Sequence, residues 1–227
     1  IINNLTDEYK FILRYEHIEI DSDTLVNFIS IFPVKVDTIH TISQIPSNMR
    51  SIYDENNVIS LLNDLKERYK EEWIQHSPSI KIRDDYIWYK NRSLIKYIKP
   101  TKEDKFVIMG DIHGSFATFL RILFRLRKSD ILNNDGILQD NYNLIFLGDV
   151  VDRGKYDYET IIILYLLIAK NGINRIYFNR GNHEEMEVNS NENYGLIKSC
   201  KVLFRNYNVI YNALNELMVL QHSAILM

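Results

Sequence analysis

The sequence predicts an α/β fold with a parallel sheet in residues 101–227, preceded by a mainly helical N-terminal extension. Two observations predict the sheet. Short apolar runs alternate with helical patterns along the C-terminal half, an order typical of parallel strands joined by right-handed crossovers. Each apolar run also ends near a glycine that is followed by a metal-binding type of side chain. Because loops at the carboxyl ends of parallel strands meet at one edge, we expect these side chains to converge.

Hydrophobic periodicity predicts each element of this sheet. Three short apolar runs, at residues 105–109, 143–147 and 173–179, are typical of buried parallel strands. Helical spacing of apolar residues predicts helices between them, over residues 116–127 and 159–170. The second of these segments is apolar on nearly all sides, so we expect that helix to be buried.

The N-terminal half carries no motif that assigns a role to it. A charged stretch that contains a proline marks the boundary between residues 1–100 and residues 101–227, which we predict to be an extension and a catalytic domain. Apolar spacing predicts helices at residues 23–32 and 57–73. Alternating residues between 80 and 99 indicate strand-like or irregular packing.

Composition and charge restrict the classes of partner. The chain has 27 Lys plus Arg and 30 Asp plus Glu residues, and neither half is basic, so we expect no nucleic acid partner. The longest apolar run, residues 161–169, is far shorter than the roughly 20 residues of a membrane-spanning helix, and no membrane partner is expected. Cys200 is the single cysteine, which excludes an internal disulfide and indicates a reducing, cytoplasmic compartment. We expect Cys200 to pack on a helix.

Three polar clusters carry the chemistry. In the first, Asp111 and His113 stand two residues apart between glycines, so that both can point at one ion from a strand end. In the second, a carboxylate at Asp149 can bridge two cations, and Arg153 offers a planar fork that matches phosphate oxygens. Taken singly, each cluster could be an ordinary helix cap or loop. Together, in this order and about one strand-helix-strand unit apart, they favour a metal site.

The third cluster is Arg180-Gly181-Asn182-His183-Glu184. Asn182 can supply a neutral carbonyl ligand, and His183 is a natural proton donor to a leaving alkoxide. The polar stretch that follows, residues 184–192, is interpreted as a solvated loop, with the alternative that it borders a substrate cleft.

The three clusters resemble the pattern of the phosphoprotein phosphatase family of calcineurin-like metallophosphoesterases: GDxHG, then GDxVDRG, then GNHE. The resemblance covers residues 105–227 and implies an α-β-β-α sandwich with two metal ions at its strand ends. It implies that Asp111 and His113 bind the first metal ion, that Asp149 bridges both ions and that Asn182 binds the second. His183 would act as the general acid, oriented by Asp152, and Arg153 would bind the phosphate.

The resemblance further implies a metal-dependent hydrolase that activates water between two divalent ions, with Mn²⁺, Fe or Zn²⁺ suited to oxygen and nitrogen ligands. Glu159 and Tyr194-Gly195 resemble the eukaryotic Ser/Thr protein phosphatases more than the bacterial dinucleoside tetraphosphatases. A phosphoprotein substrate is therefore expected. Two alternatives stay open: a nucleotide or dinucleoside polyphosphate phosphoesterase, and a catalytically inactive, phosphatase-like binding module.

The sequence departs from the family pattern after His183. The two further histidines of the second metal site and a second phosphate-binding arginine have no match there. His222 precedes an expected strand at Ala224 and is interpreted as a core or loop histidine rather than a ligand. Because the chain ends within the apolar run 223–227, we expect the natural sequence to continue.

Overall fold

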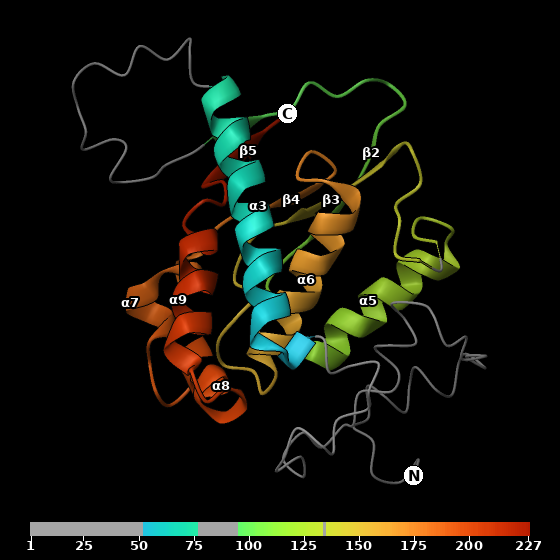
Figure 1. Cartoon of the computed structure of the whole chain (residues 1–227). Helices are drawn as coiled ribbons and strands as arrows, with labels where there is room; N and C mark the ends of the chain where they lie inside the picture. The colour runs from blue at the N-terminus through green and yellow to red at the C-terminus, as the bar shows by residue number, and fades with distance from the viewer. Residues whose placement is uncertain (1–51, 77–94, 134) are drawn as a thin grey trace, which may run out of the picture.

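The computed structural model describes residues 52–76, 95–133 and 135–227 (Figure 1). The helix expected at residues 23–32 and most of the stretch 80–99 lie outside these ranges. Three strands form a parallel sheet in the order β2-β3-β4: β2 is Lys105–Met109, β3 is Tyr142–Phe146 and β4 is Ile176–Phe178. The predicted parallel sheet is therefore confirmed.

Two crossover helices connect these strands. They are α5, Phe116–Lys128, and α6, Asp157–Asn171. Strand β4 is shorter than predicted because residues before it form a turn after α6, in which Arg175 N donates to Gly172 O (3.1 Å). Gly172 has a φ of 92°, a conformation that suits glycine at the end of a helix. The turn uses residues that the apolar pattern assigned to the strand.

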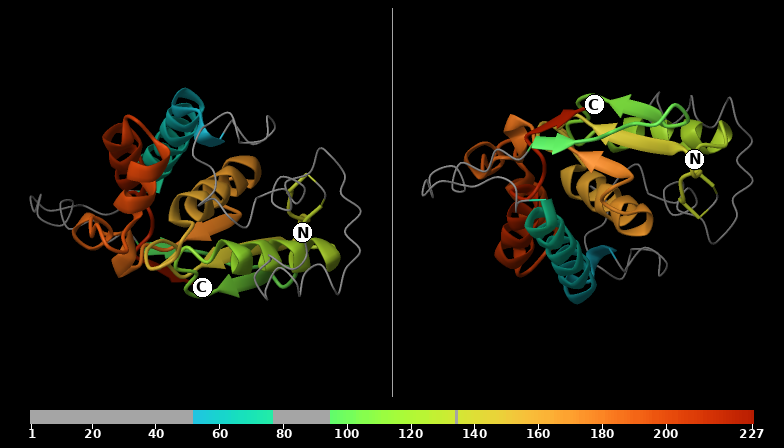
Figure 2. Two further views of the ribbon diagram at one scale, coloured as in Figure 1. Left: turned by 90° about the horizontal axis from the view of Figure 1, so that it is seen from below. Right: turned by 90° about the horizontal axis from the view of Figure 1, so that it is seen from above.

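Both crossover helices cover the same face of the sheet (Figure 2). Phe119 of α5 packs edge-on against Phe146, with ring centroids 6.0 Å apart. Tyr165 of α6 packs against Phe178 in the same way, at 6.3 Å. Phe146 and Phe178 are register partners on neighbouring strands, so their side chains share a face. Helix α6 is buried along most of its length, as predicted.

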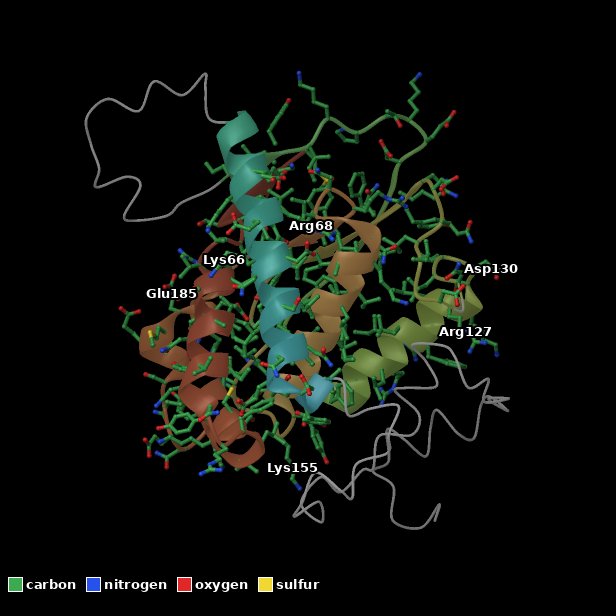
Figure 3. The ribbon with its side chains drawn as sticks, in the orientation of Figure 1. Lys66, Arg68, Arg127, Asp130, Lys155 and Glu185 are labelled. Carbon is green, nitrogen blue, oxygen red and sulfur yellow. The ribbon has the colours of Figure 1, made fainter. Side chains whose placement is uncertain are left out.

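The N-terminal helix α3, Glu55–His76, packs beside α6 and α9 in the same hydrophobic core as the sheet (Figure 1). Its buried side chains are Val58, Leu62, Leu65 and Tyr69. Charged residues lie on its other faces, among them Lys66 and Arg68 (Figure 3). Lys66 reaches Glu216 of α9 at 2.8 Å. The division of the chain near residue 100 stays a prediction, but helix α3 shares a core with residues beyond it.

The last strands form a second, two-stranded sheet. Strand β5, Ala224–Leu226, lies where the apolar run predicts a strand, and it pairs in parallel with β1, Ile95–Tyr97. An isolated bridge between Asn179 and His222 places the start of β5 beside the end of β4. Within the described ranges, no helix combines the length and the apolar character that a membrane crossing requires.

Short helices follow β4. They are the 3-10 helix η5, Asn182–Glu184, and the α-helices α7, Met186–Asn189, α8, Leu196–Leu203, and α9, Tyr207–Met218. The interpretation of residues 184–192 as a solvated loop is correct only in part: Met186, Glu187 and Glu192 are exposed, but Met186–Asn189 form α7, and Glu184 and Asn189 are buried. Asn189 accepts a hydrogen bond from the Tyr211 hydroxyl (2.6 Å) and donates one to Asn215 (2.9 Å). Cys200 is buried on α8, as expected.

Candidate functional site

The loops that follow β2 and β3 are joined by backbone hydrogen bonds. Ile112 N and His113 N both donate to Asp149 O (3.0 and 2.9 Å), and Gly114 N donates to Val150 O (2.8 Å). These bonds hold the first two polar clusters side by side at the carboxyl edge of the sheet. The predicted meeting of these two clusters is therefore found in the structure.

The loop after β4 joins the same edge. His183 N donates to the Asp149 carboxylate at 3.1 Å. His113, Asp149 and His183 each offer one ligand atom, and these three atoms lie within 4.8 Å of one another. The structure thus brings together a nitrogen or oxygen donor from each of the three polar clusters.

Backbone conformation is unusual throughout this edge. His113, Asp149, Asp152 and Arg153 have positive φ angles of 48°, 51°, 70° and 66°. Such left-handed conformations cost about 1–3 kcal/mol each for residues other than glycine, and they cluster at functional sites. The cross-loop hydrogen bonds must offset this cost in the folded chain.

The imidazole of His113 is held in one tautomer. Its Nδ1 lies 3.1 Å from Val151 O, and because a carbonyl only accepts, Nδ1 carries the proton. Its Nε2 lies 3.2 Å from Arg153 Nη1, a donor that cannot accept, so Nε2 presents its lone pair. Asp111 Oδ2 lies 3.8 Å from the same Nε2. A neutral imidazole oriented in this way is the form that binds a metal ion.

His183 and Asp152 form a buried pair. His183 Nδ1 lies 2.9 Å from Asp152 Oδ2, and the side chains are 4% and 0% exposed. Asp152 Oδ1 accepts a further hydrogen bond from Leu196 N (2.8 Å). Burial raises the pKa of Asp152, and the hydrogen bonds from His183 and Leu196 oppose that rise. The pair fixes the orientation of the His183 ring.

The other ring nitrogen of His183 has a different environment. Nε2 is buried and has no hydrogen-bond partner among the described residues. The His183 ring meets the His113 ring edge-on, with centroids 4.8 Å apart. Because buried polar atoms are nearly always paired, Nε2 is suited to a group that binds in this site.

Arg153 and Asn182 lie at the exposed side of the site. The backbone of Arg153 is fixed by a hydrogen bond from its N–H to Tyr194 O (2.8 Å). Asn182 begins η5 and directly precedes His183. Their positions leave the guanidinium and the amide accessible to an incoming ligand.

The donor set fits a divalent cation. The carboxylate of Asp149 and the lone pair of His113 are oxygen and nitrogen donors at one edge, and the Asp111 carboxylate lies 3.8 Å from His113 Nε2. Such donors suit Mn²⁺, Fe and Zn²⁺ better than they suit soft metal ions, which prefer thiolate ligands.

Sequence reasoning missed Glu184 as part of this site. Its carboxylate is 1% exposed and accepts hydrogen bonds from the backbone N–H groups of Asp149, Val150 and Gly181, all at 2.8 Å. Burial raises the pKa of Glu184 to about 7, against the lowering effect of these hydrogen bonds. The only signal in the sequence is its place directly after His183 in the third cluster.

A second missed residue is Asp157, the first residue of α6. It lies against Gly114, where an added Cβ would sit 2.0 Å from Asp157 Oδ1. Burial, followed by the charges of Asp152 and Glu159, raises the pKa of Asp157 to about 8. In the sequence, an acidic residue at a helix start is indistinguishable from an ordinary helix cap.

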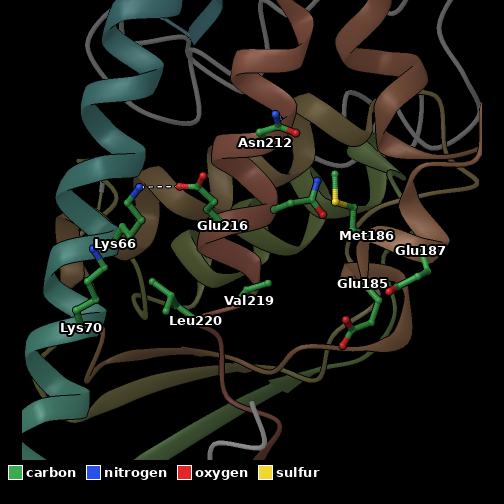
Figure 4. Close-up of a pocket in the computed structure, with 10 residues that line it drawn as sticks. Lys66, Lys70, Glu185, Met186, Glu187, Asn212, Glu216, Val219 and Leu220 are labelled. Carbon is green, nitrogen blue, oxygen red and sulfur yellow. Dashed lines mark hydrogen bonds and ion pairs between the residues drawn. The ribbon is translucent and has the colours of Figure 1, made fainter. Parts of the chain in front are cut away.

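Two other features lie apart from the cluster. His222 lies in the core, one of the two positions expected from the sequence: it is 4% exposed, and burial lowers its pKa to about 4. A pocket of about 590 Å³ opens between α3, α7 and α9, with Lys66, Glu185 and Leu220 in its walls (Figure 4). None of the predicted site residues lines this pocket.

Comparison with known proteins connects these motifs to a family. The family model of calcineurin-like phosphoesterases matches residues 104–222. The chain is similar to the serine/threonine-protein phosphatase 6 catalytic subunit of Caenorhabditis elegans, with 34% identity over 102 residues, 45% of this chain and 27% of that protein. It is also similar to serine/threonine-protein phosphatase PP1-1 of Saccharomyces cerevisiae, with 40% identity over 93 residues, 41% of this chain and 26% of that protein. The chain spans about a quarter of the length of these relatives.

A solved structure shows a similar fold. It is a protein serine/threonine phosphatase from Saccharomyces cerevisiae, described as similar to human phosphatase PP5, with a TM-score of 0.50 and 22% identity over 72% of this chain and 42% of that chain. This similarity confirms the predicted metallophosphoesterase-type α/β fold. The family match covers more than half of the chain and includes every predicted site residue. The chain therefore belongs to the calcineurin-like phosphoesterase family.

Proposed function

We propose that the protein is a metal-dependent phosphoester hydrolase that removes phosphate from serine or threonine residues of phosphoproteins. The observation that carries this proposal is the meeting of His113, Asp149 and His183 at one sheet edge, with His183 paired to buried Asp152. The names of the similar proteins, which are serine/threonine phosphatases, support the choice of substrate.

The proposed cofactor is a pair of divalent ions, Mn²⁺, Fe or Zn²⁺. Asp111 and His113 would hold the first ion, Asp149 would contact both, and Asn182 would contribute to the second. When bound, such ions supply positive charge to the phosphoryl group and lower the pKa of water. Support comes from the fixed tautomer of His113 and from the contact of His183 N with the Asp149 carboxylate.

The remaining residues would bind the phosphate and move a proton. Arg153, exposed beside His113, would place its guanidinium fork on phosphoryl oxygens as negative charge develops there. Protonated His183 would donate from Nε2 to the departing serine or threonine oxygen. Asp152 would accept the Nδ1–H and keep Nε2 directed at the leaving group, as their 2.9 Å contact supports. No residue of the chain needs to be phosphorylated.

A reducing, cytoplasmic location belongs to the same proposal. The single, buried cysteine supports it, because secreted proteins commonly use cysteines in disulfide pairs.

The function is tested with the full-length protein, a phosphoserine peptide and Mn²⁺. Asp149→Asn should lower kcat/KM by about 100-fold or more, because a shared ligand loses its charge. Glu187→Gln makes the same chemical change at an exposed position of α7 and should keep wild-type activity. Full activity in Asp149→Asn would refute the proposal. A preference for dinucleoside polyphosphates would favour the nucleotide phosphoesterase, and a wild type without Mn²⁺ binding or turnover would favour the binding module.

A further inference from the structure

The carboxylate of Glu184 joins two loops that carry proposed metal and proton-transfer residues. Its Oε2 accepts from Asp149 N and from Gly181 N, and its Oε1 accepts from Val150 N, each at 2.8 Å. Asp149 and Val150 follow β3, whereas Gly181 follows β4. A single buried side chain therefore satisfies backbone donors on both loops.

These loops approach so closely that side chains cannot separate them. A Cβ on Gly181 would lie 2.2 Å from Asp149 Oδ1 and 2.7 Å from Asp149 N. A Cβ on Gly148, which has a φ of 106°, would lie 2.5 Å from Gly181 N. Backbone donors that face one another across such a gap need a shared acceptor, since unpaired buried N–H groups are costly.

The hydrogen bonds of Glu184 also act on a strained position. Asp149 has a φ of 51°, and its N–H is one of the three groups that Glu184 holds. The carboxylate of Asp149 also accepts a hydrogen bond from the backbone N–H of His183 (3.1 Å). Movement of Glu184 would therefore change the separation between the Asp149 carboxylate and the His183 ring.

We propose that Glu184 is a positioning residue, which sets the separation of Asp149 and His183 by holding the two loops through their backbones. This inference rests on the proposed function, because the separation matters for metal binding and proton transfer. Glu184 need not touch the substrate. Its contribution comes from three acceptor contacts that no neutral side chain of the same size can reproduce.

The test is Glu184→Gln in the full chain. Glutamine keeps the shape, but its amide nitrogen is a donor and must face at least one of the three N–H groups. The matched control is Glu159→Gln, a second carboxylate that is also 1% exposed. Glu159 accepts from the Tyr53 hydroxyl (3.1 Å), and a glutamine oxygen can still accept that bond.

Mn²⁺ affinity, measured by calorimetric titration, is the first readout. Glu184→Gln should weaken Mn²⁺ binding about 10- to 100-fold, which is the effect expected when a residue that holds the metal ligands in place by hydrogen bonds is replaced. Glu159→Gln should stay within about twofold of the wild type, even if its thermal stability falls equally. Wild-type Mn²⁺ affinity in Glu184→Gln would refute the positioning role.

Amide hydrogen exchange of the wild type is the second readout and needs neither metal nor mutant. The N–H groups of Asp149, Val150 and Gly181 should exchange slowly, as core amides do. Rapid exchange at these three positions would refute the inference, including in the case where Glu184→Gln does not fold. A wild type with slow exchange but no Mn²⁺ affinity would instead refute the proposed function and leave the loop contact standing.

Discussion

The two ring nitrogens of His183 lie in different surroundings. Nδ1 contacts Asp152 at 2.9 Å, while Nε2 is buried without a hydrogen-bond partner among the described residues. Asp152 is itself in a left-handed conformation, with a φ of 70°, and its second oxygen accepts from Leu196 N. The carboxylate therefore acts as a fixed acceptor that can determine which nitrogen of His183 carries a proton.

Asp152→Asn should lower kcat on a phosphopeptide by about 100-fold and leave KM within a few-fold of the wild type. An amide that donates to Nδ1 would select the wrong tautomer of His183. The fall in rate at high pH, which reports loss of the proton from the general acid, should therefore disappear from the pH–rate profile. Asp130→Asn is the control, because Asp130 is exposed and has a similar φ of 53°. An unchanged pH–rate profile in Asp152→Asn would contradict the assigned role.

Asp157 gives a prediction for stability against pH. Its pKa is about 8 in the folded chain and about 3.8 when unfolded, so between these values the folded state binds the additional proton. The free energy of unfolding should therefore fall as pH rises from about 4 to 8, by at most about 1.4 kcal/mol for each pH unit from this group.

Asp157→Asn should remove this contribution, so the stability of the variant relative to wild type should increase from pH 4 to pH 8. Urea unfolding at pH 5, 6, 7 and 8 measures the difference. Asp135→Asn, at an exposed loop position, serves as the reference variant. A difference between Asp157→Asn and wild type that stays constant across this range would contradict the raised pKa of Asp157.

At the scale of elements, α6 connects the site to the N-terminal helix. Helix α6 begins at Asp157, a few residues after Asp152 and Arg153. Glu159 on its first turn accepts from the Tyr53 hydroxyl at 3.1 Å, and Tyr158 packs against the Tyr53 ring with centroids 6.0 Å apart. Packing from the N-terminal segment therefore supports the helix that leaves the second polar cluster.

Leu65→Ala tests whether α3 is an integral part of the core. Leu65 is fully buried on α3, so its truncation should lower the free energy of unfolding by about 2–5 kcal/mol. Leu147→Ala, at a site that is 51% exposed, should cost much less. Urea unfolding followed by circular dichroism and by tryptophan fluorescence should give coincident transitions. A separate early transition for the N-terminal segment would show that α3 is dispensable.

At the scale of the whole molecule, the sequence predicts which segments form strands and where their loops meet. Periodicity predicts β2 and α5 almost to the residue, because a buried strand and an amphipathic helix have different repeats. It does not reveal the partners of an apolar surface, so the packing of α3 against α9 and the pairing of β1 with β5 could not be predicted.

The site was predicted to a similar degree. Its donors follow from motif and strand order, and the structure brings His113, Asp149 and His183 together. The burial of Glu184 could not be predicted, because its three acceptor contacts depend on how closely two distant loops approach. The metal ligands and catalytic roles remain predictions.

Metal-linked stabilisation is the prediction for the molecule as a whole. Mn²⁺ at about 100 times its dissociation constant should stabilise the folded protein by about 2.7 kcal/mol, seen as a higher Tm that a chelator reverses. His113→Ala should abolish this increase, because a fixed nitrogen donor is lost. A Tm of the wild type that does not respond to Mn²⁺ would contradict the metal site.

The hydrogen bonds between the strand-end loops span long stretches of sequence. Asp149 is bonded to His113 across 36 residues and to Glu184 across 35. A short synthetic peptide that contains one motif would lack all of these cross-links, so we expect it to be unstructured and inert toward metal ions. During folding, the site can therefore assemble only after the sheet has brought its distant segments into register.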